Sequence, residues 1–222
     1  MDAVIKVGGS LAEKPAALKA FCNRLSEIAK EHSVVIVPGG GKFADVVREC
    51  DQQYSLSADA AHKMAILGMD QFGLLLSQVI PNSCTTYSLS TAKRLSDGKA
   101  APIFLPSQLM FRENPLEASW DVTSDSIAAY VATQLNADKA ILVKDVDGVF
   151  ESDPEKRSDA KLIPLLSARE LLAFAQRTSV DKFLPKLLLK TRLDCYVVNG
   201  AFPERIAAIL SGQRAVCTRI KA

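Results

Sequence analysis

The segment AVIKVGGSL, residues 3–11, joins a short apolar run to a pair of glycines. Its aliphatic residues are typical of a buried strand in a parallel sheet, and a helical pattern follows the glycines. In an open α/β sheet, ligands bind outside the carboxyl ends of the strands. Glycine lets the backbone approach a ligand closely, and the first N–H groups of a helix favour an anion. With Lys6 beside them, residues 8–10 therefore indicate an anion site, although a plain turn with a solvated lysine would produce the same pattern.

A second segment, VVIVPGGG at residues 34–41, repeats the pattern of an apolar strand that ends in glycines. Residues 42–48 then have the pattern of a helix. One such turn is weak evidence, but two near the start of one chain indicate two anionic groups held close together. Neither turn has the spacing of a P-loop or of the dinucleotide-binding motif G-x-G-x-x-G.

The composition favours one α/β domain that covers residues 1–222. The chain has 222 residues, of which 48% are hydrophobic, so it can build one sizeable core. Its net charge is +2, from 27 Lys+Arg against 25 Asp+Glu, and this balance predicts no binding to nucleic acid. The longest apolar candidate, residues 64–80, is interrupted by glycines and polar residues, so we expect no membrane span. The N-terminus enters a strand directly, and we expect a cytoplasmic protein without a signal peptide.

The cysteines are widely spaced and odd in number, which is typical of buried thiols in a reducing compartment rather than of a disulfide framework or a zinc site. With two histidines in the whole chain, the sequence excludes a histidine-rich metal site. The cysteines are Cys22, Cys50, Cys84, Cys195 and Cys217.

Further strands and helices alternate along the chain, which predicts a mainly parallel sheet covered on both faces. We expect strands at residues 84–87, 101–105, 139–143 and 195–198. We expect helices at residues 15–30, 57–79, 126–135, 167–176, 183–192 and 203–210, the second of them capped by Ser57. Residues 106–121 are predicted to form a long loop, and a loop of that length is often functional.

Polar residues follow or precede these elements at two more places. Thr123, Ser124 and Asp125 come just before a helix, where they would either cap it or hold an anion. The acidic run that begins at Lys144 follows a buried strand and suits ribose, base or Mg²⁺-water contacts, although a polar turn would look the same. His62 lies in the first turns of the long helix and is either structural or a donor to an anion.

Taken together, these motifs resemble the amino acid kinase superfamily, which includes acetylglutamate, uridylate and isopentenyl phosphate kinases. The motifs are KVGGS at 6–10, PGGG at 38–41, TSDS at 123–126, and DVDGVF at 145–150 with DP at 153–154. The resemblance covers essentially the whole chain. It implies a three-layer αβα sandwich with a central, mainly parallel sheet. It also implies that the γ-phosphoryl group of ATP is transferred, with Mg²⁺, to a carboxylate or phosphate oxygen.

The resemblance assigns roles to the residues that match. Lys6 would stabilise charge on the transferring phosphoryl group, and Asp125 would position the lysine or Mg²⁺ as the second catalytic residue. The metal ligands themselves are not assigned. The nucleotide would be held by Gly8, Gly9, Ser10, Lys144, Asp145, Asp147, Gly148, Val149, Phe150 and Asp153. The acceptor would be held by Gly39, Gly40, Gly41, His62, Trp120, Thr123 and Ser124.

One position departs from the family. Acetylglutamate and isopentenyl phosphate kinases place a second lysine at the start of a late helix, where this chain has Asp181. Lys186 and Lys190 lie later on the same helix and are weak candidates to replace it. The departure predicts fewer cations from the protein and a greater dependence on Mg²⁺.

Further residues indicate a phosphomonoester acceptor. His62 matches a position where isopentenyl phosphate kinases bind the substrate phosphate, and Ala61 stands where uridylate kinases have an aspartate for the nucleoside. Other segments, among them residues 61–66 and 119–126, resemble a branch of the family that acts in methanofuran biosynthesis on a furanylmethyl phosphate bearing an aminomethyl group. In that case Trp120 would stack on the furan or simply pack in the core, and Asp70 or Asp121 would pair with the amine.

Two other functions remain open at this point. The acceptor could be isopentenyl phosphate or UMP, or the chain could be a non-catalytic member that binds nucleotide or oxyanions. Retention of Lys6, both glycine turns and Asp125 argues against a non-catalytic role. We also expect a homo-oligomer that forms through the helix at residues 57–79.

Overall fold

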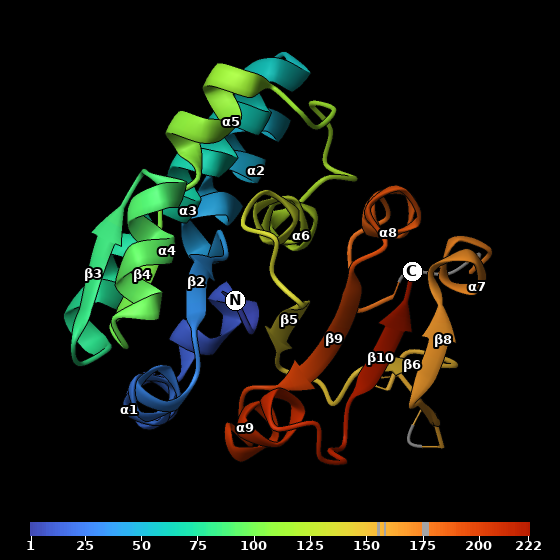
Figure 1. Ribbon diagram of the computed structural model, residues 1–222. Helices are drawn as coiled ribbons and strands as arrows, with labels where there is room; N and C mark the ends of the chain where they lie inside the picture. Colours follow the sequence, from blue (N-terminus) through green and yellow to red (C-terminus); the bar gives the residue numbers. More distant parts are fainter. Residues whose placement is uncertain (155, 158, 175–177) are drawn as a thin grey trace.

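The computed structural model describes residues 1–154, 156–157, 159–174 and 178–222 (Figure 1). Within them, eight strands form one sheet in the order β3-β4-β2-β1-β5-β9-β10-β8. Neighbouring strands are parallel except for β9 and β10, which are antiparallel. The strands are β1 (Ala3–Val7), β2 (Val34–Pro38), β3 (Ser83–Thr86), β4 (Ala101–Phe104), β5 (Lys139–Lys144), β8 (Leu165–Ser167), β9 (Asp194–Asn199) and β10 (Thr218–Lys221).

Helices cover both faces of this sheet (Figure 1). Helices α6 and α8 lie on one face, and α1 and α9 lie on the other. The structure therefore confirms the predicted three-layer αβα architecture with a mainly parallel sheet. The helices are α1 (Pro15–Glu31), α2 (Gly41–Tyr54), α3 (Ala58–Val79), α4 (Leu89–Asp97), α5 (Ser107–Glu113), α6 (Ser124–Gln134), α7 (Ala168–Leu172), α8 (Leu184–Thr191) and α9 (Glu204–Leu210).

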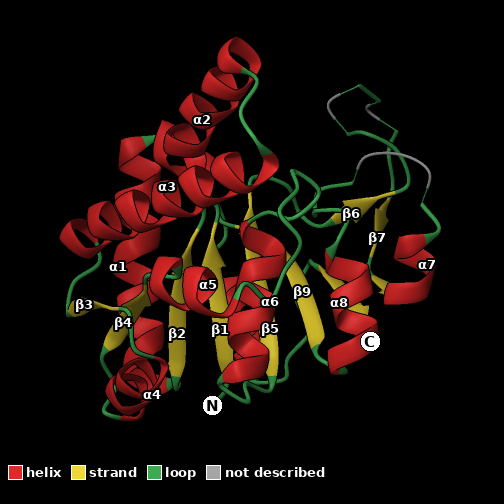
Figure 2. Ribbon diagram, turned by 90° about the horizontal axis from the view of Figure 1, so that it is seen from above, coloured by secondary structure: helices red, strands yellow, loops and turns green. Residues whose placement is uncertain are grey.

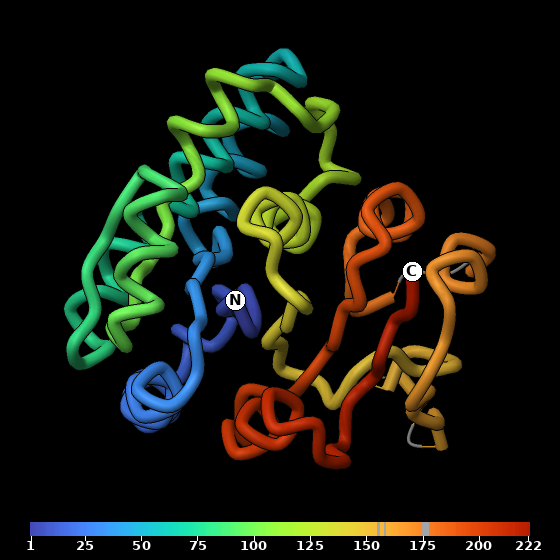
Figure 3. Tube along the Cα trace, viewed as in Figure 1, coloured from blue at the N-terminus to red at the C-terminus, as the bar shows by residue number. Residues whose placement is uncertain are grey.

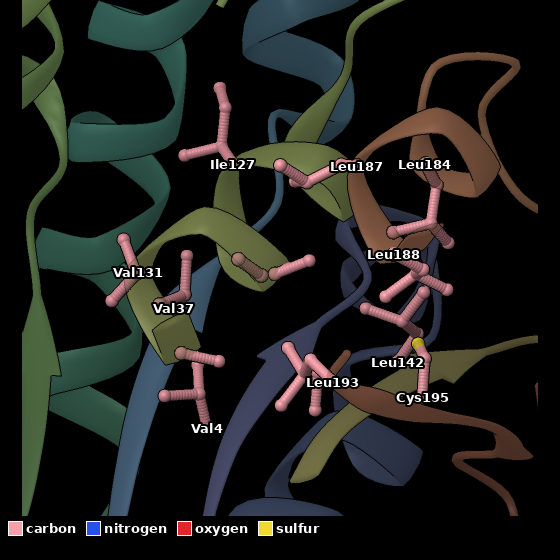
Figure 4. Close-up of a cluster of buried hydrophobic side chains, with 14 of the residues drawn as sticks. Val4, Val37, Ile127, Val131, Leu142, Leu184, Leu187, Leu188, Leu193 and Cys195 are labelled. Carbon is pink, nitrogen blue, oxygen red and sulfur yellow. The ribbon is translucent and has the colours of Figure 1, made fainter. Parts of the chain in front are cut away.

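Alternation along β1 decides which way its lysine points. Successive side chains of a strand face opposite sides of the sheet. Ala3, Ile5 and Val7 belong to the core under α1, whereas Val4 belongs to the core under α6 and α8. Figure 4 shows Val4 in the core under α6 and α8, in the same cluster as Val37 and Val131. Lys6 has the same parity as Val4, so its side chain lies on the α6 face at the carboxyl end of the strand.

The two halves of the chain meet at the centre of the sheet. Figure 3 shows residues up to about β4 on one side of the molecule and residues from β5 onward on the other. The strands β1 and β5 pair at the boundary, with Lys6 opposite Leu142 and Val7 opposite Val143. Loops that follow neighbouring strands in opposite directions leave a crevice outside the carboxyl ends at such a boundary.

Several elements gather beyond those carboxyl ends. Figure 2 shows α2, α3 and the small β6–β7 sheet at the end of the molecule opposite the N-terminus. The strands β6 (Val149–Phe150) and β7 (Leu162–Ile163) are antiparallel, and a short 3₁₀ helix, η1 (Gly9–Glu13), follows β1. Ser57 caps α3 as predicted, since its Oγ accepts a hydrogen bond from the N–H of Ala60 (3.2 Å).

The structure corrects the prediction of a long loop at residues 106–121. Its first half is helix α5, which starts at Ser107 because the carboxylate of Asp70 accepts hydrogen bonds from the N–H and the hydroxyl of that serine. Helix α7 ends at Leu172, earlier than the predicted end at residue 176, and residues 175–177 lie outside the described residues. The strands β8 and β10 and the helix α4 were not predicted.

Every helix in the described part of the chain is too short or too polar to cross a lipid bilayer.

Candidate active site

A cluster of two lysines and one aspartate lies where β1, β5 and α6 converge. Lys6 ends β1, Lys144 ends β5, and Asp125 lies in the first turn of α6. The Nζ of Lys6 is 3.0 Å from Oδ1 of Asp125, and the Nζ of Lys144 is 2.6 Å from Oδ2. We call these three residues the lysine pair and its aspartate. With one anion between two cations, the cluster carries a net positive charge.

Burial and mutual contact set the charge states of this cluster. Lys6 is 4% exposed and Asp125 is 1% exposed. Burial alone would raise the pKa of Asp125, but Lys144 and Lys6 lower it to about 2. Burial lowers the pKa of Lys6 to about 8, although Asp125 partly opposes this effect. At neutral pH, Asp125 is therefore ionised and Lys6 is mostly protonated, whereas above pH 8 Lys6 loses its charge.

Asp181 stands at the position where a second lysine was expected, and it supplies no positive charge. Its carboxylate instead supports the cluster through hydrogen bonds. Its carboxylate accepts hydrogen bonds from the N–H and hydroxyl groups of Thr123 (2.9 and 3.0 Å) and of Ser126 (2.9 and 2.6 Å), and from the N–H of Leu184 (2.8 Å). One side chain thus satisfies backbone donors at the starts of α6 and α8. The N–H of Asp181 in turn donates to Asp125 (3.2 Å).

A second cation beside Asp125 comes from Lys144. The expectation of fewer cations from the protein and a greater dependence on Mg²⁺ stays a prediction. Sequence reasoning placed Lys144 among the nucleotide contacts and did not see that parallel pairing of β1 and β5 brings it to Asp125. Neither weak candidate forms an ion pair with Asp125. Lys186 is exposed with its Nζ 5.9 Å from the ring centroid of Phe183, although it lines one further cavity together with Asp125 and Lys144. Lys190 is exposed in the last turn of α8.

The two glycine turns are in direct backbone contact. A Cβ atom on Gly9 would lie 2.1 Å from Cα of Gly41, so neither turn has room for a side chain there. Gly41 has a φ of +51°, a left-handed conformation that favours glycine. The N–H of Gly8 donates to the carbonyl of Val143 (3.1 Å), so it holds the turn against β5 and leaves later N–H groups to face a ligand.

A cavity of about 280 Å³, which we call the helix-walled cavity, opens beside these turns. Its walls come from α2, α3 and α6. The expected acceptor residues Gly40, Gly41, His62, Trp120, Thr123 and Ser124 line it, whereas Gly39 instead donates its N–H to the carbonyl of Val7 (2.8 Å). Burial lowers the pKa of His62, and Asp59 partly opposes this, so the imidazole is mainly neutral at pH 7. The apolar part of the wall is formed by Ala65, Ile66, Met69, Val122 and Ile127.

Trp120 is fixed at the rim of this cavity. Its ring nitrogen Nε1 donates a hydrogen bond to Oδ2 of Asp51 (2.7 Å), and the guanidinium of Arg48 lies 4.0 Å from the ring centroid. One face of the indole is therefore already covered by a cation. A ligand ring would have to use the other face or the ring edge.

The carboxylates that sequence reasoning named for an amine lie away from this cavity. Asp70 is buried against Ser107, and Asp121 pairs with Lys182 (3.2 Å). The carboxylates on the cavity wall are instead Glu13 and Asp45, which follow the two glycine turns. Each carboxylate follows its glycine turn by about one helical turn, and this spacing in the sequence could have identified both residues as part of the cavity wall.

A second cavity of about 410 Å³, which we call the loop-walled cavity, lies on the β5 side of the glycine turns. The expected nucleotide residues that line it are Gly8, Gly9, Ser10, Lys144, Asp145, Gly148, Phe150 and Asp153. Two others do not. Asp147 accepts hydrogen bonds from Asn199 (3.1 Å) and Arg205 (2.6 Å), and Val149 is fully buried with its N–H bonded to Thr218 (2.7 Å). Alternation along the short strand β6 turns the side chain of Val149 away from the cavity that Phe150 lines.

The two cavities meet at the lysine pair. Lys6, Gly9, Ser10 and Lys144 line both of them. An anion in each cavity would therefore contact the same two ammonium groups, which is the arrangement that transfer of a charged group between them needs.

No group of three metal-ligating side chains (His, Cys, Asp or Glu) converges among the residues that the structure describes. This donor set fits Mg²⁺ only in the way common for nucleotide sites, where phosphate oxygens and water supply most ligands.

Comparisons with known proteins identify relatives of this chain. The model of the amino acid kinase family matches residues 1–199. The chain is 36% identical over 220 residues to the [5-(aminomethyl)furan-3-yl]methyl phosphate kinase of Methanocaldococcus jannaschii, covering 98% of this chain and 96% of that protein. It is 28% identical over 231 residues to the uridylate kinase of Methanococcoides burtonii, covering 93% and 90%. The crystal structure of uridylate kinase from Archaeoglobus fulgidus shares the fold with a TM-score of 0.78 at 23% identity, covering 99% of this chain and 100% of that chain.

Proposed function

The chain belongs to the amino acid kinase family, and from this premise we propose that it is an ATP-dependent kinase that converts a small phosphomonoester to a diphosphate. We propose [5-(aminomethyl)furan-3-yl]methyl phosphate as the acceptor, as in methanofuran biosynthesis. The relative that is 36% identical over nearly the whole chain is named for this substrate, which supports the assignment.

The observation that carries the proposal is the sharing of Lys6 and Lys144 between the two cavities. ATP would occupy the loop-walled cavity with its phosphates on Gly9 and Ser10. The acceptor phosphate would occupy the helix-walled cavity at the amino end of α2, whose first N–H groups have no partner within the helix. The γ-phosphorus would then lie between the two lysines.

In the transfer step, an oxygen of the acceptor phosphate forms a bond to the γ-phosphorus, and the bond from that phosphorus to the β–γ bridging oxygen breaks to release ADP. The acceptor oxygen needs no general base, since a phosphomonoester is largely a dianion at neutral pH. Charge shifts toward the equatorial and leaving oxygens, where the lysine pair stabilises it. Asp125 touches neither cavity, so its role is to hold both ammonium groups in place.

Mg²⁺, when bound with ATP, would supply further positive charge to the β- and γ-phosphate oxygens. We assign no side chain as its ligand.

The wall of the helix-walled cavity supports a small acceptor with an apolar ring. Ala65, Ile66 and Met69 offer no hydrogen-bonding side chain for a uracil base. Ala61 is buried and leaves the position of the expected nucleoside-binding aspartate without a polar group. His62 would donate to the acceptor phosphate, and Trp120 would border the furan with the face or edge that Arg48 leaves open.

The test of this function is ADP release from Mg-ATP with three acceptors: the aminomethylfuran phosphate, UMP and isopentenyl phosphate. We expect the furan phosphate to have the highest kcat/KM, and the diphosphate product should be visible by ³¹P NMR. Preference for UMP or isopentenyl phosphate would reject the acceptor and retain the kinase. Nucleotide binding without turnover of any acceptor would favour the alternative of a non-catalytic member of the family.

We further propose a cytoplasmic homo-oligomer. Helix α3 exposes Met64, Leu67, Leu74 and Leu75 on the face opposite its buried residues. Such a stripe is typical of an interface between copies of a chain. The oligomer stays a prediction.

A further inference from the structure

The helix-walled cavity contains a charge that a phosphate site alone does not explain. Lys42, Asp45 and Arg48 follow one another at three-residue steps along α2, and all three line the cavity. Residues at such steps share one face of a helix. A carboxylate therefore stands between two cations on the wall of a cavity that has to accept an anion.

Asp45 is exposed, and neither of these neighbours forms an ion pair with it. Within the part of the chain that the structure describes, its carboxylate takes part in no ion pair and no hydrogen bond. Arg48, three residues later, lies instead over the ring of Trp120. An unpaired carboxylate near a bound phosphate repels it, so this position weakens binding of an acceptor that carries only negative charge.

The position of Asp45 on α2 fits a ligand with opposite charges at its two ends. The acceptor phosphate would sit at the amino end of the helix, where Gly41 begins α2. Asp45 follows Gly41 by four residues, which corresponds to about 6 Å along the helix axis. A short phosphomonoester with a cationic group beyond one five-membered ring spans a distance of this order.

We propose that Asp45 binds a primary ammonium group of the acceptor and so selects a phosphomonoester that is cationic at the end opposite its phosphate. This inference rests on the proposed function and adds the residue that recognises the ammonium group of the acceptor. Lys42 and the N–H groups of α2 attract the phosphate end, while Asp45 attracts the ammonium end one turn later. Glu13, the other carboxylate on the wall, belongs to the opposite turn after β1 and provides a comparison within the same cavity.

The experiment compares two acceptors in four variants, with UMP as a reference substrate. The acceptors are the aminomethylfuran phosphate and its analogue with a methyl group in place of the aminomethyl group. The variants are Asp45→Asn, Asp45→Glu, Glu13→Gln and, as a matched control, Glu49→Gln, which removes an exposed carboxylate from the same helix outside the cavity. Dissociation constants of both acceptors are measured by calorimetry without ATP, and KM and kcat are measured with Mg-ATP.

We expect wild type and Glu49→Gln to bind the amine more tightly than the methyl analogue. Asp45→Asn should weaken binding of the amine roughly tenfold or more, which is the size expected for a lost charge-assisted hydrogen bond. The loss should appear in KM rather than kcat, it should be absent for the methyl analogue, and Asp45→Glu should restore part of it.

An unchanged ratio between the two acceptors in Asp45→Asn would overturn the inference, as would a preference that is lost in Glu13→Gln but kept in Asp45→Asn. Equal turnover of both acceptors by the wild type would reject selection of the amine and leave the furan phosphate kinase standing. Turnover of UMP with no binding of either furan compound would reject the proposed acceptor and this inference together.

Discussion

The two cavities are built from different kinds of structure. Apart from the residues that it shares with the other cavity, the helix-walled cavity takes many of its side chains from α2, α3 and α6, whose starts are fixed by a glycine contact, by Ser57 and by Asp181. The loop-walled cavity takes its walls from turns after β1 and β5 and from the segment beyond β6. Side chains on a helix face can be exchanged without moving the backbone. A turn whose backbone contacts the ligand can bind it only in one backbone conformation. Under the proposed function, the comparison teaches that acceptor choice would be set mainly by side-chain identity on helices, and nucleotide binding mainly by backbone shape.

The largest expected effect lies where the two cavities meet. Lys6→Ala should lower kcat by about 10²- to 10³-fold, since it removes a cation that contacts both phosphates. KM for ATP and for the acceptor should change much less, because both cavities keep their other walls. Steady-state kinetics with each substrate varied in turn measures the three parameters.

Lys19→Ala is the control for that variant, since Lys19 is an exposed residue of α1 that lines neither cavity. If Lys6→Ala raised only one of the two KM values and left kcat unchanged, Lys6 would act in one cavity only. The claim that the two cavities share this lysine would then be wrong.

The next effect is a pH dependence that both cavities share. Lys6 has a pKa of about 8, lowered mainly by burial, so its charge is present below this pH and is lost above it. The kcat/KM for ATP, which reports the free enzyme, should therefore fall about tenfold for each pH unit above 8. Asp125, with a pKa of about 2, stays ionised and should add no acidic limb above pH 4.

Lys6→Arg tests whether Lys6 causes the fall in kcat/KM above pH 8, which is the basic limb of the pH profile. The arginine keeps its charge throughout this range, so the variant should lose the basic limb even if its activity is lower. A limb that persisted near pH 8 in Lys6→Arg would assign the titration to another group.

The smallest effect should be confined to the helix-walled cavity. His62→Ala should raise KM for the acceptor about three- to tenfold, as expected for the loss of one hydrogen bond from a neutral donor. KM for ATP should be unchanged, since His62 does not line the loop-walled cavity. A rise in the KM for ATP of the same size would show that the two cavities do not select their ligands separately.

Much of the fold and part of the site could be predicted from local patterns. Strands β1 and β2 are aliphatic runs that end in glycines, and Ser57 is a regular helix cap, so their physical signals lie within a few residues. The pairing of Lys6 with Asp125 followed from the family resemblance, and the geometry agrees with it. The two glycine turns are adjacent, with Gly9 against Gly41, and the expectation that they hold two anionic groups close together stays a prediction.

What could not be predicted depends on contacts between distant segments. Lys144 reaches Asp125 only because β5 pairs with β1, and Asp181 caps two helices only because α6 and α8 start side by side. Helix α5 was taken for loop because its cap, Asp70, lies 37 residues earlier. The strand β10 lies between β9 and β8 and runs antiparallel to β9, which no local pattern in residues 218–221 indicates.

Under the proposed function, the contact between Gly9 and Gly41 would let the main chain set the spacing of the two glycine turns that hold the substrates. The turns touch through atoms that every residue possesses, so no side chain acts as the spacer between donor and acceptor phosphates. Residues on α2 and α3 could then be replaced to admit a different acceptor while the distance between the donor and acceptor phosphates stays the same. For protein engineering, the two glycines would keep the backbone spacing constant while the residues that select the acceptor are substituted.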